Sequence, residues 1–313
     1  MRAQGERGTV TGTLDDYRIE ALIGKGGMAE VYRALAIAGP RAGQHVAVKR
    51  LLPDLARDPA YVRLFENEAE ITRRLRHPAI VEVIETGFAG GTPFIVMDYV
   101  DGKNLRQILA QCAARRILLP VDFAVYVAHV VSEALAHAHE GNDEEGRPLG
   151  IVHCDVSPSN VFVSRLGEIK LGDFGVALSA GALHDATAAG TLGKIHYLAP
   201  EQIRGEAPTP RSDIFALGAM FFELLTNEPA FPGRDVNEVG QRILAGKLRA
   251  PSELRPELPF ELDAMALRCL SPDPADRYPS AATFAAEVAT RYDPAIGTPL
   301  AIAAVVRGLF GVK

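Results

Sequence analysis

The stretch GIVHCDVSPSN, residues 150–160, decides the interpretation of this chain. Two apolar residues, Ile151 and Val152, lead directly into a loop that carries His153, Asp155 and Asn160. An aspartate and an asparagine five residues apart on one loop can both face the phosphates of a nucleotide, because carboxylate and amide oxygens are preferred ligands of the magnesium that accompanies phosphates. A cationic side chain is also expected at such a site, and residues 150–160 contain neither lysine nor arginine.

The segments around this loop predict two parts of different character. Before residue 100 the chain consists of short, β-favouring runs separated by glycines, with one helical run at residues 60–76. Beyond this point the runs are longer and helical. Residues 122–139 carry an apolar stripe at helical spacing, and residues 212–225 are apolar nearly all round, as in a buried helix. We therefore expect an α+β fold with a small β-rich lobe followed by a larger helical lobe.

The composition indicates an ordinary soluble globular protein. Of 313 residues, 48% are apolar and 23% are charged, which is typical of such domains. The net charge of −6 argues against non-specific nucleic-acid binding. The three cysteines are widely spaced and the N-terminal residues contain no apolar signal core, so we expect a cytoplasmic protein without membrane insertion. The composition does not indicate the oligomeric state.

The segment LIGKGGMAEVY, residues 22–32, places Gly24, Gly26 and Gly27 between two strand-like runs. Glycines allow backbone N–H groups to close on phosphate oxygens. The spacing alone also fits a dinucleotide-binding loop or a plain glycine hairpin. A dinucleotide loop opens a helix, however, whereas the residues after this loop favour a returning strand, and the next strand ends near Lys49.

Together these features resemble the bacterial Ser/Thr protein kinases, the eukaryotic-like or Hanks-type members of the protein kinase superfamily. The resemblance runs from about Tyr17 to Tyr292 and rests on ordered motifs: GKGGMAEV, VAVK, a helical glutamate, HCDVSPSN, DFG, APE, SDIFALG and DPADRY. It implies the two-lobed protein kinase fold, ATP and Mg²⁺ as cofactors and a protein as substrate. The expected parts are a flexible arm at residues 1–16, an N-lobe at 17–100, a C-lobe at 101–292 and a helical tail at 293–313.

The resemblance also assigns a role to a lysine and a glutamate of the N-lobe. Lys49 is expected to pair with Glu68, nineteen residues later on a helix, and to hold the α- and β-phosphates of ATP. Glu66 and Glu70 are rivals for this pairing on the same helix, and we expect them to be solvated.

Three residues of the C-lobe resemble the catalytic and metal-binding groups of the family. Asp155 resembles the base that accepts the proton of the substrate hydroxyl, and Asn160 and Asp173 resemble the two metal ligands. Met97 is expected at the back of the adenine pocket, with backbone hydrogen bonds from Asp98 and Val100 to the adenine edge. The expected nucleotide-binding set is Ile23, Gly24, Lys25, Gly26, Gly27, Val31, Ala47, Lys49, Met97, Asp98, Val100 and Phe162.

Other positions resemble structural residues of the family. His153 and Phe174 are expected to stack in an apolar spine, so His153 is expected to be neutral and not a catalyst. Glu201 and Arg277 are expected to form a buried ion pair, and Asp213 to tie its helix to the backbone of the catalytic loop. His129, His137 and His139 are expected to be packing or surface groups.

Four positions depart from the family pattern. Ala29 replaces the third glycine of the glycine-rich loop. Ser157 stands where the family has the lysine that contacts the γ-phosphate, and Ser159 stands where tyrosine kinases carry an arginine instead. Lys194 lies in the substrate-docking loop, at a position where a Ser/Thr kinase has threonine. Because charge and hydroxyl have exchanged places, we expect Lys194 to act as a catalytic residue that returns the missing cation. The alternative is a solvated loop lysine in a slow or dead enzyme.

The fourth departure is Cys154, which replaces the arginine that reads activation-loop phosphorylation. Its thiol is either a redox handle or a buried, inert group, and we expect the second. Thr187 and Thr191 remain candidates for autophosphorylation.

The leading hypothesis is a protein kinase that transfers the γ-phosphoryl group of ATP to Ser/Thr hydroxyls of proteins in bacterial signalling. The alternatives are a nucleotide-binding pseudokinase that acts as a scaffold, and a small-molecule phosphotransferase of the same fold. The segment TPLAIAAVVRGLFGVK, residues 298–313, predicts a short amphipathic helix packed on the helical lobe or on a partner, and not a membrane anchor, because its seven-residue apolar run is less than half of what spans a bilayer.

Overall fold

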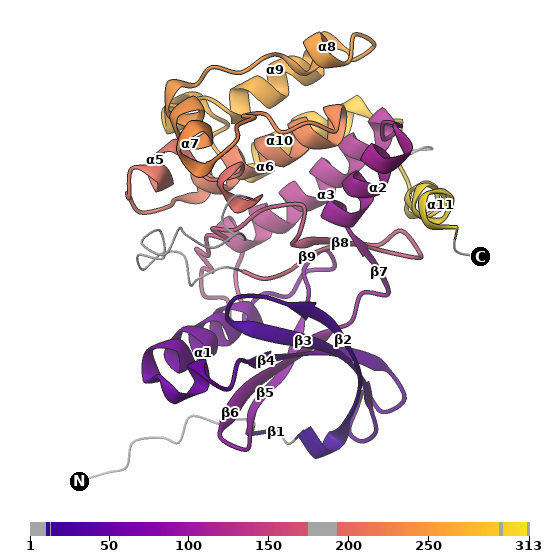
Figure 1. The fold of residues 1–313 in the computed structure, drawn as a ribbon, viewed down its shortest axis with the longest axis vertical. Coiled ribbons are helices and arrows are strands. Elements are labelled where there is room, and N and C mark those ends of the chain that lie inside the picture. Colours follow the sequence, from indigo (N-terminus) through magenta and orange to yellow (C-terminus); the bar gives the residue numbers. More distant parts are fainter. Residues whose placement is uncertain (1–10, 13, 175–192, 294–296, 312–313) are drawn as a thin grey trace. The chain divides into compact units, whose positions relative to one another are not determined.

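The structure is a computed structural model that describes residues 11–12, 14–174, 193–293 and 297–311. The chain divides by its contacts into two compact units. The first comprises the residues up to Arg73 together with Glu82–Tyr99, and the second comprises Arg74–Val81 and Val100–Lys313. The first unit is β-rich and the second mainly helical, which confirms the expected α+β organisation (Figure 1).

The first unit is a six-stranded sheet with one helix on it. The strand order is β1-β5-β6-β4-β3-β2, and β1 is the parallel member. The helix packs on β5 and β6 through Phe65 and Ala69, which contact Val83 and Ile95. The elements are β1 (Thr11–Gly12), β2 (Tyr17–Lys25), β3 (Ala29–Ala36), β4 (His45–Leu51), α1 (Pro59–Arg73), β5 (Val83–Ala89) and β6 (Thr92–Asp98).

Side chains alternate between the two faces of this sheet. Even-numbered residues of β4, Val46 and Val48, join a cluster with Phe94 and Val96 on one face. Odd-numbered residues lie on the other face, where Leu51 packs with α1. Lys49 is odd-numbered and therefore shares the face that α1 covers.

Two boundaries differ from the sequence prediction. The flexible arm was expected to extend through residue 16, whereas β1 pairs with β5 and Leu14 packs on the apolar cluster around Tyr17. Residues 74–81 were expected in the N-lobe. They belong to the second unit because the N–H of Val81 donates to the carbonyl of Leu171 at 2.9 Å and Ile80 forms a bridge with Leu171.

The second unit is built around α6, whose residues from Ser212 to Thr226 are all buried. Helices α3 and α9 contact it. A small sheet of order β7-β8-β9 lies in the same unit, and its middle strand, β8, begins directly after the loop of residues 150–160. The elements are β7 (Gly102–Asn104), α2 (Leu105–Arg115), α3 (Val121–Glu140), β8 (Val161–Ser164), β9 (Ile169–Leu171), α5 (Pro200–Ile203), α6 (Pro210–Thr226), α7 (Val236–Ala245), α8 (Pro251–Leu254), α9 (Phe260–Cys269), α10 (Ala281–Val288) and α11 (Pro299–Phe310).

A buried ion pair fixes this unit. Arg277 donates to both oxygens of Glu201, at 2.8 and 2.9 Å, and the side chain of Arg277 has no exposed surface. The remaining N–H groups of the guanidinium donate to the carbonyls of Ser271, Arg211 and Pro272, so all five are used. The pairing expected from the sequence is confirmed.

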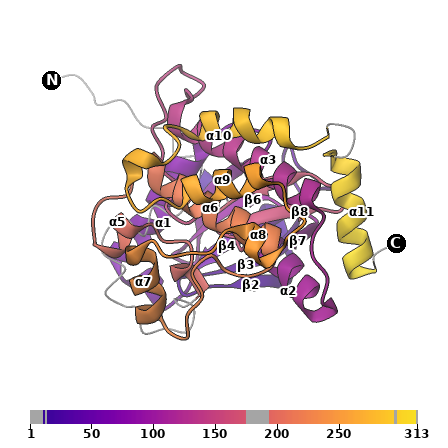
Figure 2. The ribbon, with the colours of Figure 1, turned by 90° about the horizontal axis from the view of Figure 1, so that it is seen from above.

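The C-terminal helix α11 lies against α2, as both views show (Figures 1 and 2). Its buried face consists of Ile302, Ala303, Val306 and Leu309. Gln111 of α2 donates to the carbonyl of Leu309 at 3.0 Å, which holds the end of the helix. Within the described residues, no helix is long and apolar enough to cross a membrane.

Replacing Leu309 by alanine should lower the free energy of unfolding by roughly 2–3 kcal/mol, because a buried leucine loses apolar contacts and leaves a cavity. Leu309 is 4% exposed, whereas Leu300 of the same helix is 73% exposed. Leu300→Ala is therefore the matched control and should change stability little. Thermal and urea denaturation of the two variants measure this. Equal destabilisation by both substitutions would contradict the packing of α11 on α2.

Candidate active site

Asp213 of α6 holds the loop of residues 150–160 through hydrogen bonds to its backbone. The buried carboxylate of Asp213 accepts the N–H of His153 at 2.7 Å and the N–H of Cys154 at 2.8 Å. Cys154 has a φ of +66°, a left-handed conformation that is costly for a residue with a side chain. The two hydrogen bonds to Asp213 stabilise this conformation and confirm the expected tie between helix and loop.

His139 completes this arrangement. Its Nε2 lies 2.8 Å from Oδ2 of Asp213, and both side chains are buried. Asp213 therefore has three hydrogen-bond partners, which fix the carboxylate that in turn fixes the loop. His139 was expected to be a packing or surface group, and its contact with Asp213 was not predicted from the sequence. His139 and Asp213 are 74 residues apart, and no local signal in the sequence connects them.

His153 is a structural residue of the loop. Its ring packs against that of Phe174, with 4.4 Å between the ring centroids and 41° between the ring planes. The N–H of Asp155 lies 3.2 Å from Nδ1 of His153, and Nε2 lies 3.1 Å from the carbonyl of Gly172. Burial lowers the pKa of His153, so the ring is neutral, with Nδ1 as acceptor and Nε2–H as donor. The expected contact between His153 and Phe174 is present, and the lowered pKa agrees with the expected neutral state.

Asp155 and Asn160 are in direct contact. Nδ2 of Asn160 donates to the carbonyl of Asp155 at 2.8 Å and to its Oδ2 at 3.0 Å. Since both partners are acceptors, the amide nitrogen of Asn160 must face Asp155 and its oxygen must face away. The backbone carbonyl of Asn160 accepts the backbone N–H of Gly172 at 2.9 Å. This hydrogen bond places Asp173, the residue after Gly172, beside the loop. Asp173 also has a positive φ, of 54°.

The ammonium of Lys194 lies on the carboxylate of Asp155, with 2.6 Å between Nζ and Oδ2. The side chain of Lys194 is 52% exposed and that of Asp155 is 12% exposed. Ser157 is buried, and Ser159, two residues further on, is exposed. The position expected to be filled by the family lysine therefore carries no charge, and a lysine from a different segment reaches the same aspartate.

The first unit brings Lys49 and Glu68 together. Nζ of Lys49 lies 2.5 Å from Oε1 of Glu68, and the two side chains are 14% and 15% exposed. Glu66 and Glu70 are both exposed, as expected. The alternation along β4 and the helical spacing of α1 explain why Glu68 is the partner.

Five of the residues expected to bind the nucleotide share one face of the sheet: Gly24, Val31, Ala47, Lys49 and Met97. Gly24 pairs with Val31, Val31 pairs with Lys49, and Ala47 pairs with Met97 across neighbouring strands. Paired residues of neighbouring strands lie on the same face, so the register collects this set around Lys49.

The glycine-rich loop is the turn between β2 and β3. The N–H of Gly26 donates to the carbonyl of Ala29 at 2.8 Å, and Lys25 forms an ion pair with Glu30 at 2.9 Å. A strand and not a helix follows Gly27, which excludes the dinucleotide-binding alternative. Ile23 lies in β2 beside Gly24.

The remaining nucleotide-binding candidates lie at the end of β6 and in the second unit. The N–H of Asp98 donates to the carbonyl of Glu82 at 3.0 Å, so a hydrogen bond from Asp98 to an adenine would have to use its carbonyl. Val100 is the first residue of the second unit after β6, and Phe162 lies in β8, two residues after Asn160.

All three cysteines are buried. Burial raises the pKa of Cys154 to about 12, and the nearby charges of Asp213 and Asp155 add to the effect. A thiol with this pKa is almost entirely protonated near neutral pH and is a poor nucleophile. The burial of Cys154 and its raised pKa therefore favour the inert thiol over the redox handle. Thr187 and Thr191 lie outside the described residues.

A cluster of Arg106, Tyr197 and Glu223 was not predicted from the sequence. Arg106 of α2 donates to Glu223 of α6 at 2.9 Å and also to the hydroxyl of Tyr197, which in turn donates to Glu223. The N–H of Arg106 donates to the carbonyl of Pro158 at 3.0 Å. This cluster therefore connects the loop that carries Asp155 with the segment that carries Lys194.

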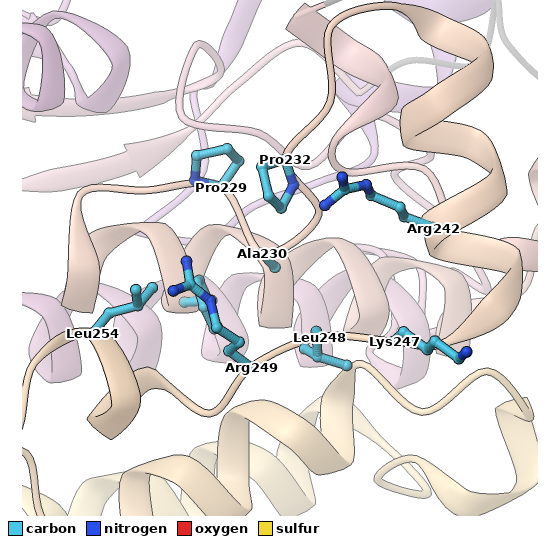
Figure 3. A pocket seen from close by; sticks show the side chains of 9 residues that line it. Pro229, Ala230, Pro232, Arg242, Lys247, Leu248, Arg249 and Leu254 are labelled. Atoms are coloured by element: carbon cyan, nitrogen blue, oxygen red, sulfur yellow. The ribbon is translucent and has the colours of Figure 1, made fainter.

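A hollow of about 250 Å³ lies elsewhere in the second unit (Figure 3). Its lining combines prolines and leucines with Arg242, Lys247 and Arg249. None of the nucleotide-binding, catalytic or metal-binding candidates is among its lining residues, so it is separate from the site described above.

Comparisons with known proteins agree with this geometry. A family model for the protein kinase domain matches residues 17–288. The chain is 38% identical over 269 residues to the tyrosine-protein kinase MasK of Myxococcus xanthus, an alignment that covers 86% of this chain and 42% of MasK. It is 37% identical to the serine/threonine-protein kinase PknB of Mycobacterium tuberculosis, with 88% of this chain and 42% of PknB covered. For PrkC of Bacillus subtilis the identity is 35%, with 88% and 40% covered.

The chain thus spans about two fifths of the length of these relatives. Among solved structures, the kinase domain of PknI from Mycobacterium tuberculosis, as a double mutant, superposes with a TM-score of 0.67 at 30% identity, covering 91% of this chain and 99% of that one. The described fold, the ordered motifs and these similarities lead to one assignment. The chain belongs to the protein kinase domain family and has the protein kinase fold.

Proposed function

We propose that this chain transfers the γ-phosphoryl group of ATP to serine and threonine hydroxyls of protein substrates, including its own. The observation that carries the proposal is the contact between Asp155 and Asn160 on one loop, with Asp173 held beside them through Gly172. The Lys49–Glu68 pair in the first unit supports the same function.

The residues fit magnesium and ATP. The amide oxygen of Asn160 faces away from Asp155, and no donor among the described residues contacts it, so it is available to a cation. Mg²⁺ is held by one or two protein oxygens together with phosphates and water. Bound there by Asn160 and Asp173, Mg²⁺ would neutralise phosphate charge.

Each protein group has a defined part in the reaction. Lys49, oriented by Glu68, holds the α- and β-phosphates, and the face of the sheet with Ala47 and Met97 holds the adenine. The substrate hydroxyl oxygen attacks the γ-phosphorus, and the bond from this phosphorus to the β–γ bridging oxygen breaks, so that ADP leaves. Asp155 accepts the hydroxyl proton as the reaction proceeds.

Two alternatives are less well supported. A scaffold without activity would be expected to lack at least one of the five groups named above, and all are present. A tyrosine acceptor is suggested by the similarity to MasK, a tyrosine-protein kinase. Ser159, however, stands at the position where tyrosine kinases carry a compensating arginine, and most of the named relatives are serine/threonine kinases.

Incubation with γ-labelled ATP, Mg²⁺ and a generic basic protein, followed by phosphoamino-acid analysis, tests the proposal. We expect label in phosphoserine and phosphothreonine, and none when Mg²⁺ is chelated. Label confined to phosphotyrosine would change the acceptor class. ATP binding without any transfer would instead favour the scaffold.

A further inference from the structure

The loop around Asp155 lacks a cation of its own, although the proposed reaction develops charge on a phosphoryl group. Residues 150–160 contain no lysine or arginine. Among the described residues, Lys194 is the only lysine or arginine that pairs with Asp155. We propose that Lys194 is the catalytic cation of phosphoryl transfer, supplied by the docking segment in place of the loop lysine that Ser157 has replaced. This inference rests on the proposed kinase activity.

The contact on Asp155 leaves the aspartate able to act as a base. Lys194 Nζ and Asn160 Nδ2 both contact the same oxygen, Oδ2, at 2.6 and 3.0 Å. No donor among the described residues contacts Oδ1. The ammonium and the amide therefore fix the orientation of the carboxylate through Oδ2. Within the described part of the chain no donor occupies Oδ1, the oxygen that would accept the substrate hydroxyl proton.

Lys194 is close enough to reach the transferring group. A base must lie within about 3 Å of the hydroxyl that it deprotonates, and that hydroxyl must lie about 3–3.5 Å from the phosphorus that it attacks. An ammonium in contact with Asp155 is therefore within roughly 6–9 Å of the phosphorus by these distances, even in its present position. Its side chain is 52% exposed and has a flexible four-carbon stem, so a rotamer change can bring the ammonium onto a phosphoryl oxygen.

The backbone that carries Lys194 is fixed. The carbonyl of Lys194 accepts the N–H of Tyr197 at 3.1 Å. Tyr197 is buried, and its hydroxyl is held by Glu223 and Arg106. Because the N–H of Arg106 also holds the carbonyl of Pro158, the segment of Lys194 and the loop of Asp155 share one anchor. The backbone of Lys194 is therefore held in place, whereas its exposed side chain can change rotamer. This combination suits a cation that contacts the phosphoryl group during transfer.

In the proposed step Lys194 remains an ammonium. The hydroxyl oxygen of the substrate forms a bond to the γ-phosphorus, the bond from phosphorus to the bridging oxygen breaks, the proton passes to Asp155, and the ADP oxygen takes the electron pair. Lys194 contacts the equatorial phosphoryl oxygens, where charge accumulates, and stabilises that charge more strongly in the transition state than in the ground state.

The kinetic test measures three variants in the labelled-ATP assay and compares each with wild type. They are Lys194→Met, Lys194→Arg and the control Lys247→Met. Methionine keeps the length of the side chain and removes its charge. We expect Lys194→Met to lower kcat by on the order of 10²-fold with a smaller change in KM for ATP, and Lys194→Arg to keep part of the activity. Lys247 is exposed and lines the separate hollow, so its substitution should leave activity unchanged.

A double-mutant cycle tests the exchange of positions. Lys194→Thr combined with Ser157→Lys should be more active than Lys194→Thr alone, because residues that share one role are non-additive. Ser157 is buried, so the fold of the double variant is checked by its thermal midpoint. If the folded double variant shows only the sum of two losses, or if Lys194→Met equals wild type, Lys194 is not the cation. A gain of activity on removing Lys194 would show that its ion pair blocks Asp155, which also overturns the inference.

A binding measurement gives a result that does not depend on turnover. Calorimetry with Mg²⁺ compares ADP with the β,γ-imido analogue of ATP, which has a γ-phosphoryl group that is not transferred. For Lys194→Met we expect unchanged ADP affinity and a loss for the analogue on the order of three- to tenfold. Equal effects on both nucleotides would overturn the inference while leaving the kinase activity standing. A wild-type chain that binds neither nucleotide would overturn the proposed function itself.

Discussion

Replacing Asp155 by asparagine should reduce phosphoryl transfer by on the order of 10²–10⁴-fold and leave ATP binding nearly intact. Asparagine has almost the same shape and can still accept a hydrogen bond from Asn160 or Lys194, so the loop should keep its geometry. An amide oxygen cannot take up the hydroxyl proton at neutral pH, and this is the function that is lost. Initial rates with labelled ATP, together with nucleotide affinity by calorimetry, measure the two effects separately.

Asp173→Asn is the contrasting variant, because it removes a charge from the proposed metal ligand and not from the base. We expect it to weaken nucleotide binding in the presence of Mg²⁺ and to have much less effect when Mg²⁺ is absent. The two aspartates would then be distinguished by binding as well as by rate. Near-wild-type phosphorylation by Asp155→Asn would show that another group, or solvent, removes the proton.

The contacts that follow from local geometry could be predicted from the sequence. Lys49 and Glu68 are nineteen residues apart, but strand alternation places the lysine on the face that the helix covers, and the helical spacing selects Glu68. Asp155 and Asn160 are only five residues apart, and one loop brings them together. In both cases the order of motifs along the chain indicated the family, and the short-range geometry of the strand, helix or loop indicated which residues are in contact.

The contacts that depend on packing could not be predicted in this way. His139 reaches Asp213 from a helix 74 residues away, and Arg106 reaches Tyr197 across 91 residues. A histidine on an amphipathic helix and an arginine after a helix cap are common features, and neither indicates its partner. The same holds for residues 74–81, whose polar beginning and short apolar run do not indicate that they join the second unit.

Lys194 lies between these two cases. Its distance of 39 residues from Asp155 excludes any local argument. The sequence nevertheless indicated the contact, because an unexpected lysine and a missing lysine occurred at two positions that the family resemblance places beside the same aspartate. A pair of departures was more informative than either alone.

The second large effect concerns the buried ion pair of Glu201 and Arg277. Replacing Arg277 by methionine should lower the free energy of unfolding by about 3–5 kcal/mol, because it leaves the carboxylate of Glu201 buried with Ser212 as its remaining side-chain donor. Methionine retains apolar packing against Phe215, whose ring centroid lies 5.0 Å from the guanidinium. Urea denaturation at neutral pH measures the loss. Arg204→Met, which breaks an ion pair of 2.6 Å with Glu206 on the surface, is the control and should change little.

The ion pair of Glu201 and Arg277 also predicts how the free energy of unfolding changes at acidic pH. Burial alone would raise the pKa of Glu201, but the hydrogen bonds from Arg277 and Ser212 outweigh it and hold the pKa below the ordinary value of 4.5. A carboxyl group with a depressed folded-state pKa contributes stability that is complete above its unfolded pKa and is lost as the pH falls through the folded value. Glu201→Gln should therefore flatten the decline of stability below about pH 4.5.

The two charges of this ion pair can also be removed together. If Glu201→Met combined with Arg277→Met is less harmful than Arg277→Met alone, the cost comes from an unpaired buried charge, as we expect. If the double variant shows the sum of the single losses, the cost comes from lost packing and the ion pair has no special role.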